Sequence, residues 1–121
     1  MTEERHARDQ WIESVPEAWA GPRFRSSHII DSSVLKGLAP AKLAGAIQNK
    51  LAKPNIRVVS LTLFEPTVQD RAAGIEWVAA EVAGVDQPDD PDEEARRKEY
   101  WEAAMAAAVF EVVNDLRAQT P

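Results

Sequence analysis

The segment from residue 56 to residue 64 constrains the fold more than any other part of the chain. Its sequence, IRVVSLTLF, follows the two-residue period of a strand, yet both sets of alternating residues are largely apolar. The two sets are Ile56, Val58, Ser60, Thr62 and Phe64 on one side and Arg57, Val59, Leu61 and Leu63 on the other. If one side of the strand faced solvent, one of these two sets would be polar. This strand is therefore expected at the centre of a sheet or covered on both faces.

The flanking segments predict one more strand and five helices. Residues 24–31 alternate as a half-buried strand does. Apolar periodicity predicts helices at residues 3–13, 40–52, 67–83 and 92–118, and the capping box of Ser14 and Glu17 predicts a short helix at 14–19. Pro40 opens one helix at a position where its missing N–H is harmless. Thr67 forms a capping pair with Asp70 at the start of the next, and Asp92 caps the longest.

The predicted order is therefore α-α-β-α-β-α-α, a mainly helical α+β class with a small sheet of two or three strands covered by helices. One domain is expected to span residues 1–121, because the only linker-like piece is an acidic turn at residues 84–94 before the last helix. A helical crossover between the strands suggests that they are parallel. Two strands make a poor sheet alone. A third strand at residues 32–37, completion by another subunit and full helical cover remain open alternatives.

Composition limits the chemistry of the chain. The sequence contains no cysteine, which excludes disulfides, thiolate metal sites and cysteine nucleophiles. The N-terminus is charged, so no signal peptide is expected, and no apolar run approaches the roughly 20 residues that span a bilayer. We expect a soluble cytoplasmic protein.

Charge is distributed unevenly along the chain. The net charge is −6, but residues 23–57 hold seven basic side chains against one acidic side chain. This basic segment is either a polyanion-binding face or a region neutralised by its own acidic flanks, in the monomer or across an oligomer. Nucleic-acid binding is the alternative function that the segment suggests. The candidate residues are Arg23, Arg25, Lys42, Asn49, Lys50, Lys53 and Arg57.

Catalytic and metal-binding patterns are weak. His28, Asp31 and Ser33 are triad residue types, but a strand at 24–31 would point His28 and Asp31 to opposite faces. The two histidines lie in different elements, and the acidic turn lacks the spacing of a calcium loop. No glycine-rich phosphate loop is present in the sequence. We therefore predict a protein that is not an enzyme and that has no cofactor or metal.

The sequence IIDSSVLKGL around Asp31 suggests a further alternative. An apolar strand, then Asp-Ser-Ser, then a helix that begins with apolar residues resembles the phosphorylatable segment of STAS-domain anti-sigma-factor antagonists. The resemblance implies a phosphorylation switch with Ser32 or Ser33 as the phosphate acceptor.

Surplus apolar surface favours protein binding as the leading function. Trp77 lies off the main stripe of its predicted helix, and residues 103–113 are apolar almost all round. The predicted interface residues are Trp77, Ala103, Ala106 and Phe110. We predict a homodimer through the Phe110 side of the last helix, unless the N-terminal helix folds back over that side. An accessory, inhibitor or assembly subunit of a bacterium or its virus fits this pattern, and the partner stays open.

Overall fold

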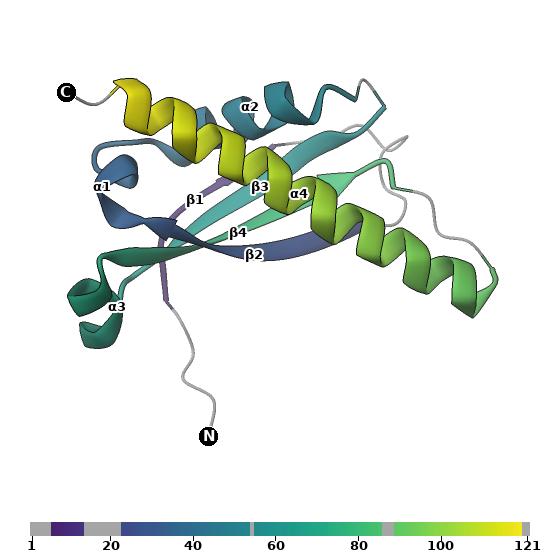
Figure 1. Ribbon diagram of the computed structural model, residues 1–121, viewed down its shortest axis with the longest axis horizontal. Coiled ribbons are helices and arrows are strands. Elements are labelled where there is room, and N and C mark those ends of the chain that lie inside the picture. Colours follow the sequence, from purple (N-terminus) through teal and green to yellow (C-terminus); the bar gives the residue numbers. More distant parts are fainter. Residues whose placement is uncertain (1–5, 14–22, 54, 86–88, 120–121) are drawn as a thin grey trace.

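The computed structural model describes residues 6–13, 23–53, 55–85 and 89–119 (Figure 1). The elements are β1 (Ala7–Ile12), β2 (Arg23–Asp31), α1 (Ser32–Leu35), α2 (Pro40–Leu51), β3 (Arg57–Phe64), α3 (Val68–Ala73), β4 (Ile75–Ala83) and α4 (Pro91–Gln119). The strands form one antiparallel sheet in the order β1-β3-β4-β2. The predicted α+β class is confirmed, but the sheet has four strands instead of two or three.

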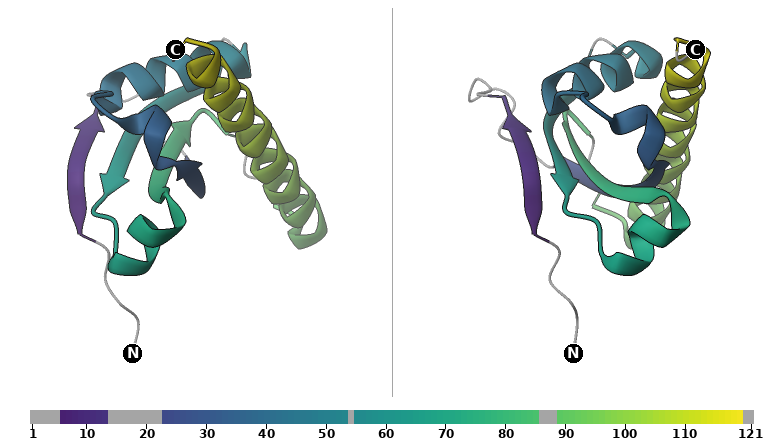
Figure 2. Two further views of the ribbon diagram at one scale, coloured as in Figure 1. Left: turned by 60° about the vertical axis from the view of Figure 1, so that its left-hand side comes forward. Right: turned by 90° about the vertical axis from the view of Figure 1, so that its left-hand side faces the viewer.

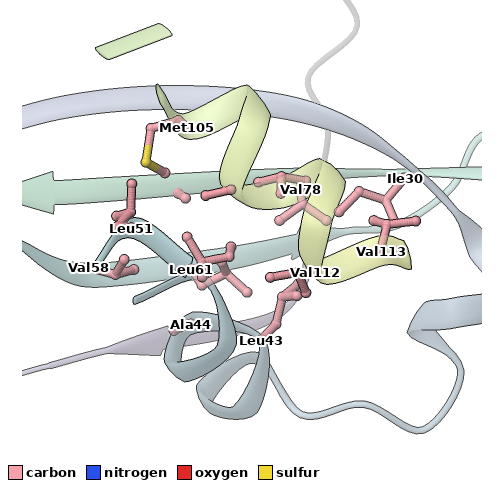
Figure 3. Close-up of a cluster of buried hydrophobic side chains, with 14 of the residues drawn as sticks. Ile30, Leu43, Ala44, Leu51, Val58, Leu61, Val78, Met105, Val112 and Val113 are labelled. Carbon is pink, nitrogen blue, oxygen red and sulfur yellow. The ribbon is translucent and has the colours of Figure 1, made fainter. Parts of the chain in front are cut away.

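The two long helices lie on one face of the sheet, where α2 crosses the C-terminal part of α4 (Figures 1 and 2). α2 packs against β3, α4 packs against β2, and the helices contact each other. One cluster of buried side chains fills the space between the layers, as Figure 3 shows. Leu61, Val78 and Met105 are at most 1% exposed within it. We call this side of the sheet the covered face and the opposite side the open face.

β3 is an interior strand, as its two apolar sets predicted. It lies between β1 and β4, and a register shift between Val58 and Ser60 interrupts its pairing with β4. Among the described residues, helices cover one face of the sheet, and the predicted cover by helices is confirmed for that face.

α2 forms where the sequence predicts it. Pro40 occupies its first turn, and Ala52 ends it in a left-handed conformation with φ 52°. Gln48 ties the helix to the start of β3. Its Nε2 donates to the carbonyl of Ile56, and its Oε1 accepts from the N–H of Val58, both at 2.7 Å.

The helix predicted at residues 67–83 is wrong beyond its first turns. The capping box of Thr67 and Asp70 is present, but the helix ends at Gly74, which has φ 71°. Residues 75–83 then form β4 in the middle of the sheet. Both faces of β4 carry apolar side chains, so spacings of three and four residues between them arise without a helix.

The helix predicted at residues 3–13 is also wrong. Residues 7–12 form the edge strand β1, which pairs antiparallel with β3. Backbone bonds beyond both ends extend this pairing, from Glu13 N to the Val59 carbonyl at 2.9 Å and from Glu65 N to the His6 carbonyl at 2.8 Å. Long-range hydrogen bonding therefore decides the structure of this polar segment. The helix predicted at 14–19 lies outside the described residues.

The two predicted strands are parallel, as expected, but they are not neighbours in the sheet. β2 and β3 run the same way, but β4 lies between them and pairs antiparallel with both. The alternative of a third strand at 32–37 is wrong, because residues 32–35 form the short helix α1. Asp31 caps this helix by accepting from the N–H of Ser33.

Candidate functional site

The open face of the sheet is the first candidate surface, and the strand register defines its residues. One row across the strands contains Ile12, Ser60, Glu81 and Arg25, and the next contains Gln10, Thr62, Ala79 and Ser27. The following row places Ile29 beside Trp77. Most of this face is small or polar, unlike the aliphatic covered face.

Large apolar side chains gather at one end of the open face. Ile29 is 54% exposed beside the half-buried Trp77. Phe64 follows Leu63, which faces the helices, so alternation along β3 turns the half-buried Phe64 to the open face. These side chains give the open face an apolar end centred on Trp77. Ile12, on the edge strand β1, is 66% exposed but lies at the opposite end of the face, in the row of Arg25.

Arginines gather at the other end of the open face. Arg23 Nη1 donates to Glu81 Oε1 at 3.1 Å. Arg57 donates to both carboxylate oxygens of Glu13, with its Nε 2.6 Å from Oε2. The hydrogen bond from Arg57 holds the pKa of Glu13 below its usual value and raises the pKa of Arg57. Arg25 is exposed and pairs with no carboxylate in the part of the chain that the structure describes.

The outer side of α4 is the second candidate surface. Ala103, Ala106 and Phe110 are exposed there, and Phe110 is 65% exposed. Trp77 lies across the sheet from this helix. The structure therefore places the four predicted interface residues on two separate surfaces. Residues 7–12 are β1 at the sheet edge, so the alternative in which these residues form a helix folded back over Phe110 is wrong.

The polar side chains His28 and Asp31 of β2 form hydrogen bonds with residues near them in the sequence. His28 lies on the covered face, and its Nε2 is 2.8 Å from the Ser26 hydroxyl. Burial lowers the pKa of His28. Asp31 accepts from the backbone N–H of Ser33 at 3.0 Å and from its hydroxyl at 2.8 Å, and these bonds lower the pKa of Asp31. His28 and Asp31 point to opposite faces, as predicted.

Ser32 and Ser33, the proposed phosphate acceptors, lie in the first turn of α1. Both line a cavity of about 700 Å³ whose charged lining residues are Arg8, Asp9, Lys36 and Glu76. Phosphorylation at either serine stays a prediction.

Arg8 and Glu76 form a partly buried ion pair at this cavity that the sequence does not reveal. Arg8 Nη1 lies 2.9 Å from Glu76 Oε1, and Glu76 is 8% exposed on the covered face. The other carboxylate oxygen, Oε2, has no hydrogen-bond partner among the described residues. Because residues 67–83 were predicted to form a helix, nothing in the local sequence indicated that Glu76 would be buried.

The basic segment does not form one continuous face. Arg23, Arg25 and Arg57 belong to the open face, whereas Lys42, Asn49, Lys50 and Lys53 belong to the helix layer or the turn after it. Lys50 Nζ lies 2.7 Å from Asp115 Oδ2 of α4, and this bond raises the pKa of Lys50. Lys53 Nζ lies 5.4 Å from the centre of the Tyr100 ring. Arg23, Lys50 and Arg57 are thus each paired with an acidic side chain.

No cluster of three or more potential metal ligands occurs among the residues that the structure describes. Part of the acidic turn, residues 86–88, lies outside them. Within the same residues, no helix has the length and apolar content needed to cross a membrane. No protein-family model matches the chain, and neither a curated protein nor a solved structure gives a significant match.

Proposed function

We propose that the protein is a cytoplasmic, non-enzymatic interaction module that binds a protein partner through the open face of its sheet. The observation that carries this proposal is the exposure of Ile29 beside Trp77 on a face that neither α2 nor α4 covers. Aromatic side chains in partly exposed apolar clusters are the usual anchors of protein interfaces. An accessory protein, an inhibitor or an assembly subunit would act in this way.

The arginine end of the open face supports a partner that also carries an acidic group. Arg25 stands two residues before Ser27 and four before Ile29, on the same face of β2. Its guanidinium forms no ion pair with a described residue, whereas Arg23 is held by Glu81. A partner that presents an apolar side chain to Trp77 and a carboxylate to Arg25 would complement both ends of this face.

The distribution of basic residues supports a protein partner over a nucleic acid. A nucleic-acid groove needs cations that stand together and remain free for phosphates. Here the candidate cations lie on two sides of the molecule, and Arg23, Lys50 and Arg57 bind internal carboxylates. The net charge of −6 also opposes approach to a polyanion.

Affinity capture from the native host, followed by calorimetry with the purified partner, tests the proposal. Trp77→Ala should weaken binding by roughly tenfold or more, as expected for an aromatic anchor. Trp77→Phe should retain most of the affinity, and Lys42→Glu on α2 should leave it unchanged. A partner that binds Trp77→Ala as tightly as wild type, with that variant folded by circular dichroism, contradicts the proposal.

A further inference from the structure

β2 offers a complete and regular edge to a partner. It pairs with β4 through nine consecutive residues without a register shift, and within the described part of the chain it is the last strand of the sheet on its side. β1, at the other edge, has a bulge at Arg8, between Ala7 and Asp9. Bulges protect sheet edges, whereas long regular edges pair readily with another strand.

We propose that β2 pairs antiparallel with β2 of a second copy of this chain, about a twofold axis at Ser27. The sequence of β2 is complementary to itself in this register. Arg23 of each copy then lies opposite Asp31 of the other, which brings opposite charges together at both ends of the ladder, beside their internal partners Glu81 and Arg117. Phe24 lies opposite Ile30, and both side chains are on the covered face. The contact is isologous, as closed dimers require.

In a neighbouring register, the sequence of β2 is less complementary to itself. Side chains on one face stay together only if the ladder shifts by two residues, since a shift of one would oppose inward-facing and outward-facing positions. A shift that places His28 on the axis pairs Arg25 with Asp31 but puts Ser26 opposite Ile30. It also leaves Arg23 and Phe24 without opposing strand residues. The register centred on Ser27 uses the full strand.

α4 supplies an independent second observation on the same side of the molecule. Arg117 Nη2 lies 3.3 Å from Asp31 Oδ2 at the end of β2, so its side of α4 faces this edge. Phe110 precedes Arg117 by two helical turns and lies on the same side. Ala103 and Ala106, both exposed, continue this stripe at spacings of three and four residues.

The two α4 helices would lie on one face of the joined sheet, because a twofold axis perpendicular to the sheet exchanges the copies without exchanging its faces. Each exposed Phe110 stripe would then face the other copy across the axis, and the small side chains of Ala103 and Ala106 permit close approach. The open face stays open in this dimer. The inference is therefore independent of the proposed function.

Single cysteines test the register directly, because the natural chain contains none. Directly opposite residues of an antiparallel pair have Cα atoms about 4.5–5.5 Å apart, within the range that a disulfide bridges. Ser27→Cys should form a linked dimer under mild oxidation roughly tenfold faster than Gln10→Cys on the exposed β1 edge, because pairing holds the thiols together. Equal rates overturn the proposal. Faster linking of His28→Cys than of Ser27→Cys overturns this register.

Charge variants at the axis test the dimer without oxidation. Ser27→Lys and Ser27→Glu each place like charges opposite one another on an exposed position, so each should sediment as a monomer with an unchanged far-ultraviolet spectrum. A mixture of the two variants should restore a dimer. A wild-type mass of 13.4 kDa at high concentration overturns the proposal. A dimer of Ser27→Lys in the absence of Ser27→Glu also overturns the proposal.

Discussion

The two faces of the sheet come from the same strands, yet they have opposite chemistry. The covered face consists mainly of buried aliphatic side chains that meet Ile47 and Met105 of the helices. The open face is mostly small or polar, with exposed apolar side chains such as Ile12 and Ile29. The covered face thus contributes most of the buried apolar surface, and the open face is the one that we propose for binding. If this division is correct, substitutions on the two faces should differ strongly in their effects.

Adjacent isoleucines on β2 give the largest expected contrast. Ile30 is 2% exposed on the covered face, and Ile29 is 54% exposed on the open face. Ile30→Ala should lower the free energy of unfolding by about 2–5 kcal/mol, since it removes buried methyl groups and leaves a cavity. Ile29→Ala should lower it by less than about 1 kcal/mol. Urea denaturation at one fixed protein concentration measures both. Equal losses would mean that the open face is also part of a core.

The ion pair between Arg8 and Glu76 is a charged exception on the covered face, and breaking it has the next largest expected effect. Arg8→Ala leaves the buried carboxylate without its cation, and it should lower the free energy of unfolding by about 1–3 kcal/mol, less than for a fully buried pair because Arg8 is about one-third exposed.

Replacing both partners provides the control. The double variant Arg8→Met with Glu76→Leu should regain most of the wild-type stability, because an apolar pair needs no compensation for buried charge. Denaturant titrations of the wild type, Arg8→Ala and the double variant give the three free energies of unfolding to compare. A double variant less stable than Arg8→Ala would show that Glu76 is stabilised by more than this pair.

The sequence predicts elements well where local signals and tertiary packing agree. Pro40 and the apolar stripe of α2 place that helix correctly, and the two apolar sets of residues 56–64 place β3 inside the sheet. α4 begins at Pro91, close to its predicted start, but the predicted cap is wrong, because Asp90 and not Asp92 accepts from a first-turn N–H. These elements have a period or a cap that only one structure satisfies.

Prediction fails where a strand imitates a helix or depends on a distant partner. Ile75, Val78 and Val82 have helical spacing, but they lie on both faces of β4. Gly74, in its left-handed conformation, is the one local signal of the change from helix to strand. β1 depends on hydrogen bonds to β3, some 50 residues away, which no local pattern encodes.

The open face was not predicted, because β1 and β4 were predicted as helices. Without β1 and β4 there is no broad sheet, so Trp77 was expected on a helix, and no open face could be predicted. The predicted interface set therefore combines residues from two separate surfaces. Arg8 and Glu76 escaped notice for the same reason, since they meet only when both strands are in place.

His28 is a second polar group on the covered face, and it predicts a moderate dependence of stability on pH. Burial lowers the pKa of His28 in the folded protein, so the unfolded chain binds a proton at higher pH than the folded chain does. The contribution of His28 to stability is then fully present above its unfolded pKa of about 6.5 and is lost as the pH falls through the folded value.

The measurement is the free energy of unfolding between about pH 8 and pH 5.5, a window in which histidine is the side chain that normally titrates. Stability should fall toward acid in the wild type. His28→Gln, which can still bond to Ser26, should flatten that slope. An unchanged slope in this variant assigns the dependence to other groups.

Ile12 should show the smallest effect, and it tests whether the open face is exposed in the intact protein. Ile12→Thr keeps the branched shape at Cβ that strands favour while it adds a hydroxyl, so the strand preference changes little. Because Ile12 is 66% exposed, the free energy of unfolding should change by less than about 0.5 kcal/mol. A loss above about 1.5 kcal/mol would mean that another part of the protein covers Ile12, since only a buried methyl group has so large an effect. A small change in stability together with weaker partner binding would instead extend the binding surface from Trp77 across the sheet to β1.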